Sequence, residues 1–92
     1  MKEYSYEWDE IKRQANFANH GVNFRDVVHL IWDQALTIDQ VHQTELRHLS
    51  YAPIDDRLYA IVWTQREAAI RVISFRKANA REVAKYEKTI QN

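Results

Sequence analysis

The chain has 92 residues, of which 46% are hydrophobic and 28% are charged, and it contains no cysteine. We expect a single domain over residues 1–92, because a chain of this size supports one hydrophobic core and this composition excludes a disordered protein. Without cysteine, the chain has neither disulfides, thiolate metal sites nor thiol catalysis. No apolar run approaches the ~20 residues of a membrane span. Met1 to Glu10 form no cationic, apolar leader. We therefore expect a soluble, cytoplasmic protein without membrane contact.

The net charge of zero hides a strong asymmetry along the chain. Residues 1–65 carry six Lys and Arg against ten Asp and Glu, a net charge of −4. Residues 66–92 carry seven against three, a net charge of +4. A neutral average is unusual for a protein that binds nucleic acid, but the basic second part keeps that function open.

Two short helices are predicted at the start of the chain. Asp9 is placed to cap a helix that runs to about Ala18, and the only glycine, Gly21, follows it as a stop. The apolar positions of this helix repeat at helical spacing: Ile11, Ala15 and Ala18. Asn23 is placed to cap a second helix that ends near Trp32-Asp33. Its apolar stripe has the same spacing: Phe24, Val27, Val28 and Ile31.

Four strands and a final helix are predicted next. The strands are expected at residues 35–41, 45–52, 58–64 and 70–75, with a turn over residues 53–56, and a short extra strand is possible at residues 4–8. Asn79 and Glu82 form a capping box for the last helix. The buried stripe of that helix is expected to be Ala80, Val83, Tyr86 and Ile90. Short connections favour an antiparallel meander of four, or five, strands covered by helices, which is an α+β fold.

A cationic segment follows the last predicted strand. Arg76 and Lys77 lie just before a helix N-terminus, where positive charge is locally unfavourable, so an anion is a reasonable ligand for them. Three further arginines lie on or beside the predicted strands: Arg47, Arg66 and Arg71. Arginine suits phosphate because its planar fork donates two parallel hydrogen bonds. The alternative is that these arginines pair with Glu45, Glu82 or the acidic N-terminal segment.

The histidines and aromatic residues are less specific. His20, His29, His42 and His48 lack metal-ligand spacing, so we expect no metal and no cofactor. His20, at a helix C-terminus, is either a proton-transfer group or a capping residue. Trp63 is expected in the core rather than stacked on a base. Tyr86 either packs in the core or offers its hydroxyl to the basic surface.

Two blocks of this sequence resemble the BrnT family, the toxins of type II toxin–antitoxin systems. The first block of the resemblance comprises residues 6–12, Asn16 and residues 20–24. The second block comprises Glu45, Arg47, residues 62–66, residues 71–78, Glu82 and Tyr86. The two blocks together cover almost the whole chain.

The resemblance implies a RelE-like fold and a ribonuclease, a toxin that arrests growth by cleaving RNA. It also implies a BrnA-type antitoxin, a ribbon-helix-helix protein that neutralises the toxin in what we expect to be a 2:2 complex. That complex represses the shared operon by binding operator DNA through the antitoxin. The alternative is a protein without catalytic activity, whose basic face binds a segment of a partner protein.

A mechanism without a metal fits the residues of this family. The 2′-hydroxyl attacks phosphorus, and the charge on the phosphate oxygens is stabilised by arginine. The catalytic candidates are His20 as acid or base, Arg66 and Arg76 with Arg47 in support, and Tyr86. The candidates for RNA binding are Lys12, Arg71, Lys77 and Arg81.

Overall fold

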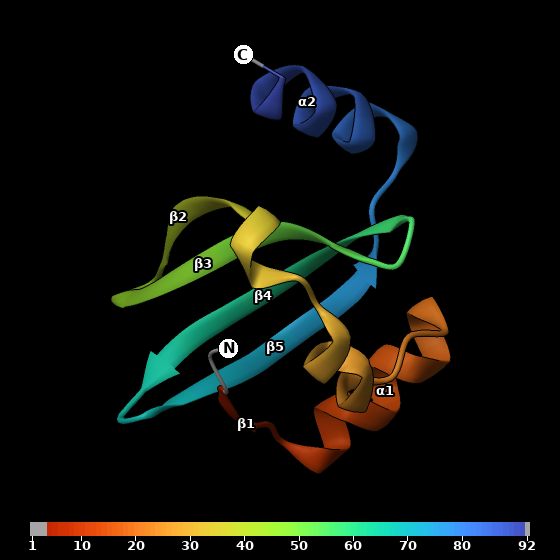
Figure 1. Ribbon diagram of the computed structural model, residues 1–92. Helices are drawn as coiled ribbons and strands as arrows, with labels where there is room; N and C mark the ends of the chain where they lie inside the picture. Colours follow the sequence, from red (N-terminus) through yellow and green to blue (C-terminus); the bar gives the residue numbers. More distant parts are fainter. Residues whose placement is uncertain (1–3, 92) are drawn as a thin grey trace.

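The computed structural model describes residues 4–91, which have an α+β fold (Figure 1). Its elements in chain order are β1 (Ser5–Glu7), α1 (Glu10–His20), the 3-10 helices η1 (Phe24–His29) and η2 (Trp32–Gln34), β2 (Leu36–His42), β3 (Glu45–Ile54), β4 (Arg57–Arg66), β5 (Ala69–Lys77) and α2 (Ala80–Ile90). The strands form a single sheet in the order β1-β5-β4-β3-β2. Neither α-helix among the described residues has the length and apolar character that a membrane crossing needs.

The sheet is mixed rather than wholly antiparallel. β2 to β5 form the predicted antiparallel meander, and the short extra strand expected at residues 4–8 is present as β1. However, β1 pairs in parallel with β5, with Tyr6 opposite Ile70. The expectation of an antiparallel sheet was therefore wrong at this edge, because a three-residue strand carries no signal for a partner so distant in sequence.

Helix α1 begins after Asp9 and stops before Gly21 as predicted, but it runs to His20 rather than to about Ala18 and buries a different side. The Asp9 side chain accepts hydrogen bonds at the N-terminus, and Gly21 ends the helix with φ 69°. The predicted stripe lies on the solvent side, and Ile11 is 77% exposed. The buried residue is Asn16, whose side-chain amide donates to the Phe75 carbonyl (2.7 Å) and accepts from the Phe75 N–H (3.2 Å). β1 pairs with residues Ala69 to Arg71 of β5. Farther along β5, at Phe75, the side chain of Asn16 supplies hydrogen bonds to the backbone.

The single second helix predicted to end near Trp32-Asp33 is instead two 3-10 helices, η1, which ends at His29, and η2. The Asn23 side chain caps η1, and Phe24 and Val27 are fully buried, whereas Val28 is 62% exposed. Side chains three apart align along a 3-10 helix, so its buried face is narrower than the predicted stripe. The α-helical period that was predicted for residues 24–31 was therefore wrong, because residues 24–29 follow the three-residue period of a 3-10 helix.

The strands are longer than predicted at several ends. β3 continues through Pro53 to Ile54, so the expected four-residue turn shrinks to Asp55 and Asp56, with φ 54° at Asp55. β2 pairs with β3 only as far as Tyr51. Pro53 therefore lies beyond β2, at an edge of the sheet, where the N–H that proline lacks is not needed for strand pairing.

The two faces of the sheet carry separate cores. On one face, which we call the helical face, α1 and η1 cover a cluster that includes Phe24, Ile61 and Phe75. On the other face a smaller cluster packs under α2: Tyr51, Leu58, Ala60, Ala78 and Tyr86. The capping box of Asn79 and Glu82 is confirmed. α1 and α2 thus lie on opposite sides of the sheet (Figure 1).

Candidate functional site

Four arginines lie on the face of the sheet that α2 partly covers, which we call the arginine face. Side chains alternate between the two faces of a strand. Arg47 shares the face of Tyr51 in β3, and Arg66 shares the face of Ala60 in β4. In β5, Arg76 lies opposite Ala60 and Arg71 lies opposite Thr64. The structure therefore places all four arginines on one face, with Arg66 and Arg71 near one end of β4 and Arg76 opposite Ala60, six positions of β4 away from Arg66.

An irregularity in β5 makes this grouping possible. Arg71 and Arg76 are five residues apart, so a regular strand would direct them to opposite faces. The register between β4 and β5 shifts at Val62 and Trp63, where Ser74 and then Val72 are the partners and Ile73 is passed over. The shift restores both arginines to the same face, as a β-bulge does.

Carboxylates pair with the arginines of this face. Arg47 donates to Glu45 (Nε to Oε1, 2.7 Å) and Arg71 donates to Glu7 (Nη1 to Oε2, 2.8 Å). These are two of the pairings that the sequence left open as an alternative to anion binding. Arg66 has a looser contact with Glu7, 3.9 Å between Nη1 and Oε2, and its side chain is 56% exposed. Arg66 is consequently the most available of the four for an external anion.

The fourth arginine belongs to a tight network under α2. Arg76 donates from Nη1 and Nη2 to the two carboxylate oxygens of Glu82, at 2.8 and 2.9 Å. This pair lowers the pKa of Glu82 to about 2 and raises the pKa of Arg76. The Tyr51 hydroxyl donates to the same carboxylate, and its pKa is raised by burial and by Glu82.

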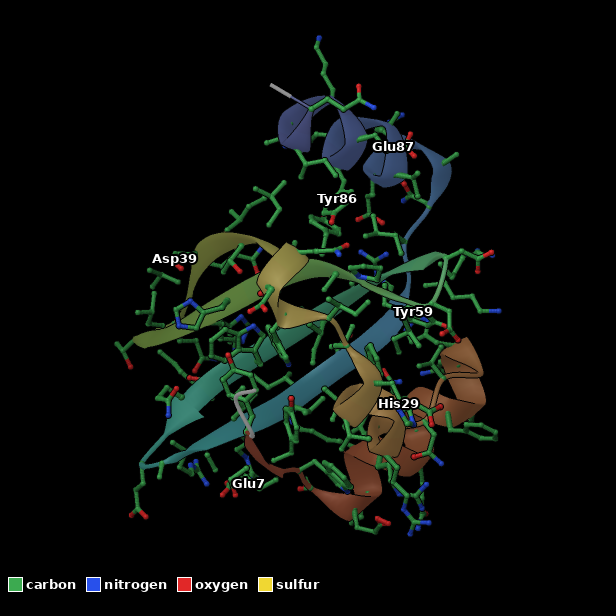
Figure 2. The ribbon with its side chains drawn as sticks, viewed as in Figure 1. Glu7, His29, Asp39, Tyr59, Tyr86 and Glu87 are labelled. Carbon is green, nitrogen blue, oxygen red and sulfur yellow. The ribbon has the colours of Figure 1, made fainter. Side chains whose placement is uncertain are left out.

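Tyr86 anchors α2 to the rest of the domain. Its hydroxyl donates to the Gln34 carbonyl at 2.6 Å, and burial raises the pKa of the phenol. Figure 2 shows the side chain directed from α2 toward the sheet. Of the two alternatives left open for Tyr86, the structure shows packing in the core under α2, with its hydroxyl engaged by the backbone.

The other predicted site residues are dispersed. His20 and Lys12 are exposed on α1, which covers the helical face, so the structure does not bring them to the four arginines. Lys77 lies at the exposed end of β5, opposite Tyr59 and on the other face from Arg76. Arg81 is exposed in the first turn of α2.

A groove opens where β3 and β4 diverge, which we call the strand-end groove. Its lining residues are Glu45, Leu46, His48, Thr64, Gln65 and Arg66. The last paired residues of β3 and β4 at this end are His48 and Trp63. Beyond them the Thr64 hydroxyl donates to the Leu46 carbonyl at 2.8 Å. Arg66 and a histidine, His48, therefore share one cavity.

In the sequence, His48 was weighed only against metal-ligand spacing, so its position in this groove was not predicted. A hairpin centred on Gln43-Thr44 places Asp39 directly opposite His48. The strands predicted at residues 35–41 and 45–52 already imply this pairing, because they leave only a short turn between them. No group of three or more His, Asp or Glu side chains among residues 4–91 is arranged to hold a metal ion. The arrangement suits binding of a phosphodiester beside an imidazole, since arginine pairs with phosphate oxygens and imidazole exchanges protons near neutral pH.

Comparison with known proteins places the chain in a family. A family model described as "Ribonuclease toxin, BrnT, of type II toxin-antitoxin system" matches residues 8–82. The crystal structure of the ribonuclease toxin BrnT of Brucella abortus is similar, with a TM-score of 0.68 and 27% sequence identity over 84% of this chain and 99% of that chain. A comparison with curated proteins finds no match. The chain therefore belongs to the BrnT family of ribonuclease toxins of type II toxin–antitoxin systems.

Proposed function

We propose that this chain is a RelE-like, metal-independent endoribonuclease of the cytoplasm, which arrests growth by cleaving RNA. The observation that carries this proposal is the grouping of Arg47, Arg66, Arg71 and Arg76 on one face of the sheet. A cleaving phosphodiester needs fixed positive charge because charge builds on its non-bridging oxygens. Arg66 is the guanidinium group of this face that carboxylates hold least, so it is the one that supplies this charge most directly.

The cleavage step uses only groups that RNA and this chain supply. The 2′-hydroxyl loses its proton to a base, its oxygen forms a bond to phosphorus, and the bond from phosphorus to the 5′ oxygen breaks. An acid then protonates the leaving oxygen. Arg66, the most exposed of the four arginines, stabilises the phosphate oxygens, with Arg47 in support. A role for Arg76 stays a prediction, because Glu82 holds both of its terminal nitrogens. RNA binding by Lys12, Arg71, Lys77 and Arg81, and proton transfer by His20 or Tyr86, stay predictions.

An antitoxin is the partner that membership of a type II system implies. We propose that it is a BrnA-type ribbon-helix-helix protein that forms a 2:2 complex with the toxin. In that complex the antitoxin neutralises the toxin and binds operator DNA. The support for this partner is the family assignment together with the sequence resemblance.

Cleavage of a labelled RNA tests the proposed activity. Arg66→Ala should lower the rate by about 10²-fold or more, because removing one preformed donor to a developing oxyanion has an effect of this size. Arg57→Ala is the matched control, since Arg57 is an exposed arginine of the same strand at the other end of the sheet. The wild-type rate should be unchanged in a strong chelator. Loss of cleavage in the chelator would overturn metal independence.

The alternative, a protein that only binds a partner segment, predicts a different pattern. Wild-type protein that binds antitoxin but neither cleaves RNA nor slows growth would establish it and would overturn the ribonuclease proposal. Equal cleavage by Arg66→Ala and Arg57→Ala would remove the arginine face from the mechanism.

A further inference from the structure

His48 is held in a fixed orientation by Asp39. Its Nδ1 lies 2.7 Å from Asp39 Oδ1, across the β2–β3 pair. An ionised carboxylate only accepts hydrogen bonds, so Nδ1 carries the proton and, in the neutral ring, Nε2 has a free lone pair. The side chain of His48 is 18% exposed and lines the strand-end groove. This is the arrangement that orients an imidazole for proton transfer.

The other side of the imidazole ring rests on Trp63. The ring centroids are 4.4 Å apart with an angle of 38° between the planes. Trp63 is itself fixed, because its Nε1 donates to the Ser50 hydroxyl at 2.9 Å and its ring meets Trp32 edge to face. With one nitrogen bonded and one face covered, His48 retains little rotational freedom.

The charges around the strand-end groove favour an anion at one position. Arg66 lines the groove, and its loose contact with Glu7 leaves donors available. Glu45 also lines the groove, but Arg47 holds it by a hydrogen bond that lowers the pKa of the carboxyl group. The other titratable neighbours are Asp39 and His42 on β2. A phosphate paired with Arg66 would therefore lie beside the imidazole rather than beside a free carboxylate.

We propose that His48 is the general base of RNA cleavage, oriented by Asp39 as a positioning residue, with Arg66 holding the scissile phosphate in the same groove. This inference rests on the proposed ribonuclease function. Nε2 accepts the proton of the 2′-hydroxyl as the bond from that oxygen to phosphorus forms. The bond to the 5′ oxygen breaks, and the leaving oxygen takes a proton from water. The protonated His48 then gives its proton to the hydroxide that remains, which restores the neutral base. The products are a 2′,3′-cyclic phosphate and a free 5′-hydroxyl, so neither an oxidant nor another co-reactant enters the step.

The position of Arg66 favours His48 over His20. His20 lies on α1 against the helical face, whereas Arg66 belongs to the arginine face. His48 also comes from the helical face by strand alternation, but the groove lies at the strand ends, where residues from both faces line one cavity. A base on α1 would have no arginine of this group beside it.

The test compares His48→Asn with His29→Asn in the full-length protein on the same RNA. Asparagine retains a donor for Asp39 but transfers no proton, so His48→Asn should lower the single-turnover rate by about 10²-fold or more. His29 is an exposed histidine of η1 outside the groove, and His29→Asn should cleave like the wild type (Figure 2). Thermal unfolding of each variant checks that the fold is intact.

A second variant separates chemistry from structure. His48→Ala opens space on Trp63, and added imidazole should restore part of its cleavage rate. Adding imidazole should not change the rate of Arg66→Ala. Equal cleavage by His48→Asn and wild type would overturn the inference and leave the ribonuclease function standing. Loss of activity in His48→Asn without rescue of His48→Ala would also overturn it and assign His48 a structural role. A wild-type protein that cleaves no RNA would instead refute the proposed function.

Discussion

Glu82 occupies both terminal nitrogens of Arg76, with Nη1 to Oε1 at 2.8 Å and Nη2 to Oε2 at 2.9 Å. A carboxylate and a phosphate present the same two-oxygen edge to guanidinium. The same Glu82 carboxylate caps α2 by accepting from the Asn79 N–H. One side chain thus connects the arginine face to the start of the last helix.

Acid should weaken the fold through this pair. The pKa of Glu82 is about 2 in the folded chain against an ordinary value of 4.5. Because the folded value is lower, the stabilisation is complete above pH 4.5 and is lost as the pH falls toward 2. We expect the pair to contribute about 1–2 kcal/mol to the free energy of unfolding, since Arg76 remains partly exposed to solvent. Urea unfolding between pH 7 and 2 measures this loss.

The matched variants are Glu82→Gln and Glu87→Gln. Glutamine at position 82 retains an acceptor for the Asn79 N–H but no charge, so the acid-dependent part of the stability should shrink. Glu87 is exposed on the same helix (Figure 2), and its variant should follow the wild-type curve. Identical acid profiles for the wild type and Glu82→Gln would contradict the assignment.

Asn16→Ala should be among the most damaging changes in α1. The side chain satisfies the N–H and carbonyl of Phe75 and also donates to the Val22 carbonyl at 3.1 Å. Truncation leaves buried backbone groups without these partners, at an expected cost of about 2–4 kcal/mol in the free energy of unfolding. Asn19→Ala, at an exposed position of the same helix, should change it by less than about 0.5 kcal/mol. Equal denaturation midpoints for the two variants would refute this role.

Gly21→Ala tests the backbone conformation alone. Gly21 has φ +69°, and no neighbouring atom lies within 4 Å of where a Cβ would be. The left-handed conformation should therefore lower stability by about 1–2 kcal/mol without a steric clash. Asparagine tolerates this conformation better, so thermal unfolding should place Gly21→Asn between alanine and the wild type. A stabilised Gly21→Ala would be inconsistent with this geometry.

Salt dependence should reveal which arginines contact phosphate. A single-stranded DNA oligonucleotide lacks the 2′-hydroxyl and so reports binding without cleavage. Removing one arginine that contacts phosphate should reduce the log–log salt slope of its affinity by about 0.7. We expect this reduction for Arg71→Ala and none for Arg57→Ala. If the two slopes agree, Arg71 pairs only with Glu7.

Local signals in the sequence predicted local structure well. Asp9, Asn23 and the box of Asn79 and Glu82 cap helices as expected, because capping depends on residues within one turn. The buried side of α1 was not predictable from apolar spacing, since its buried residue is the polar Asn16. That burial depends on backbone groups of β5, which only the folded sheet places there.

The candidate site required long-range information. Arginine composition identified Arg47, Arg66, Arg71 and Arg76, but their common face depends on the register shift at Val62 and Trp63. His48 gains its setting from Asp39, Trp63 and Arg66, which lie on two other strands. Spacing along the chain therefore indicated the residue types of the site and missed the histidine in its groove.

The pairing of β1 with β5 also bears on synthesis of the toxin. Glu7 and Arg71 lie 64 positions apart, so the first strand to leave the ribosome waits for the last one before it has a partner. Formation of such non-local contacts is a late event in folding. The arginine face is consequently incomplete in any nascent chain that ends before Arg76. A ribosome therefore carries no complete arginine face until it has translated past Arg76.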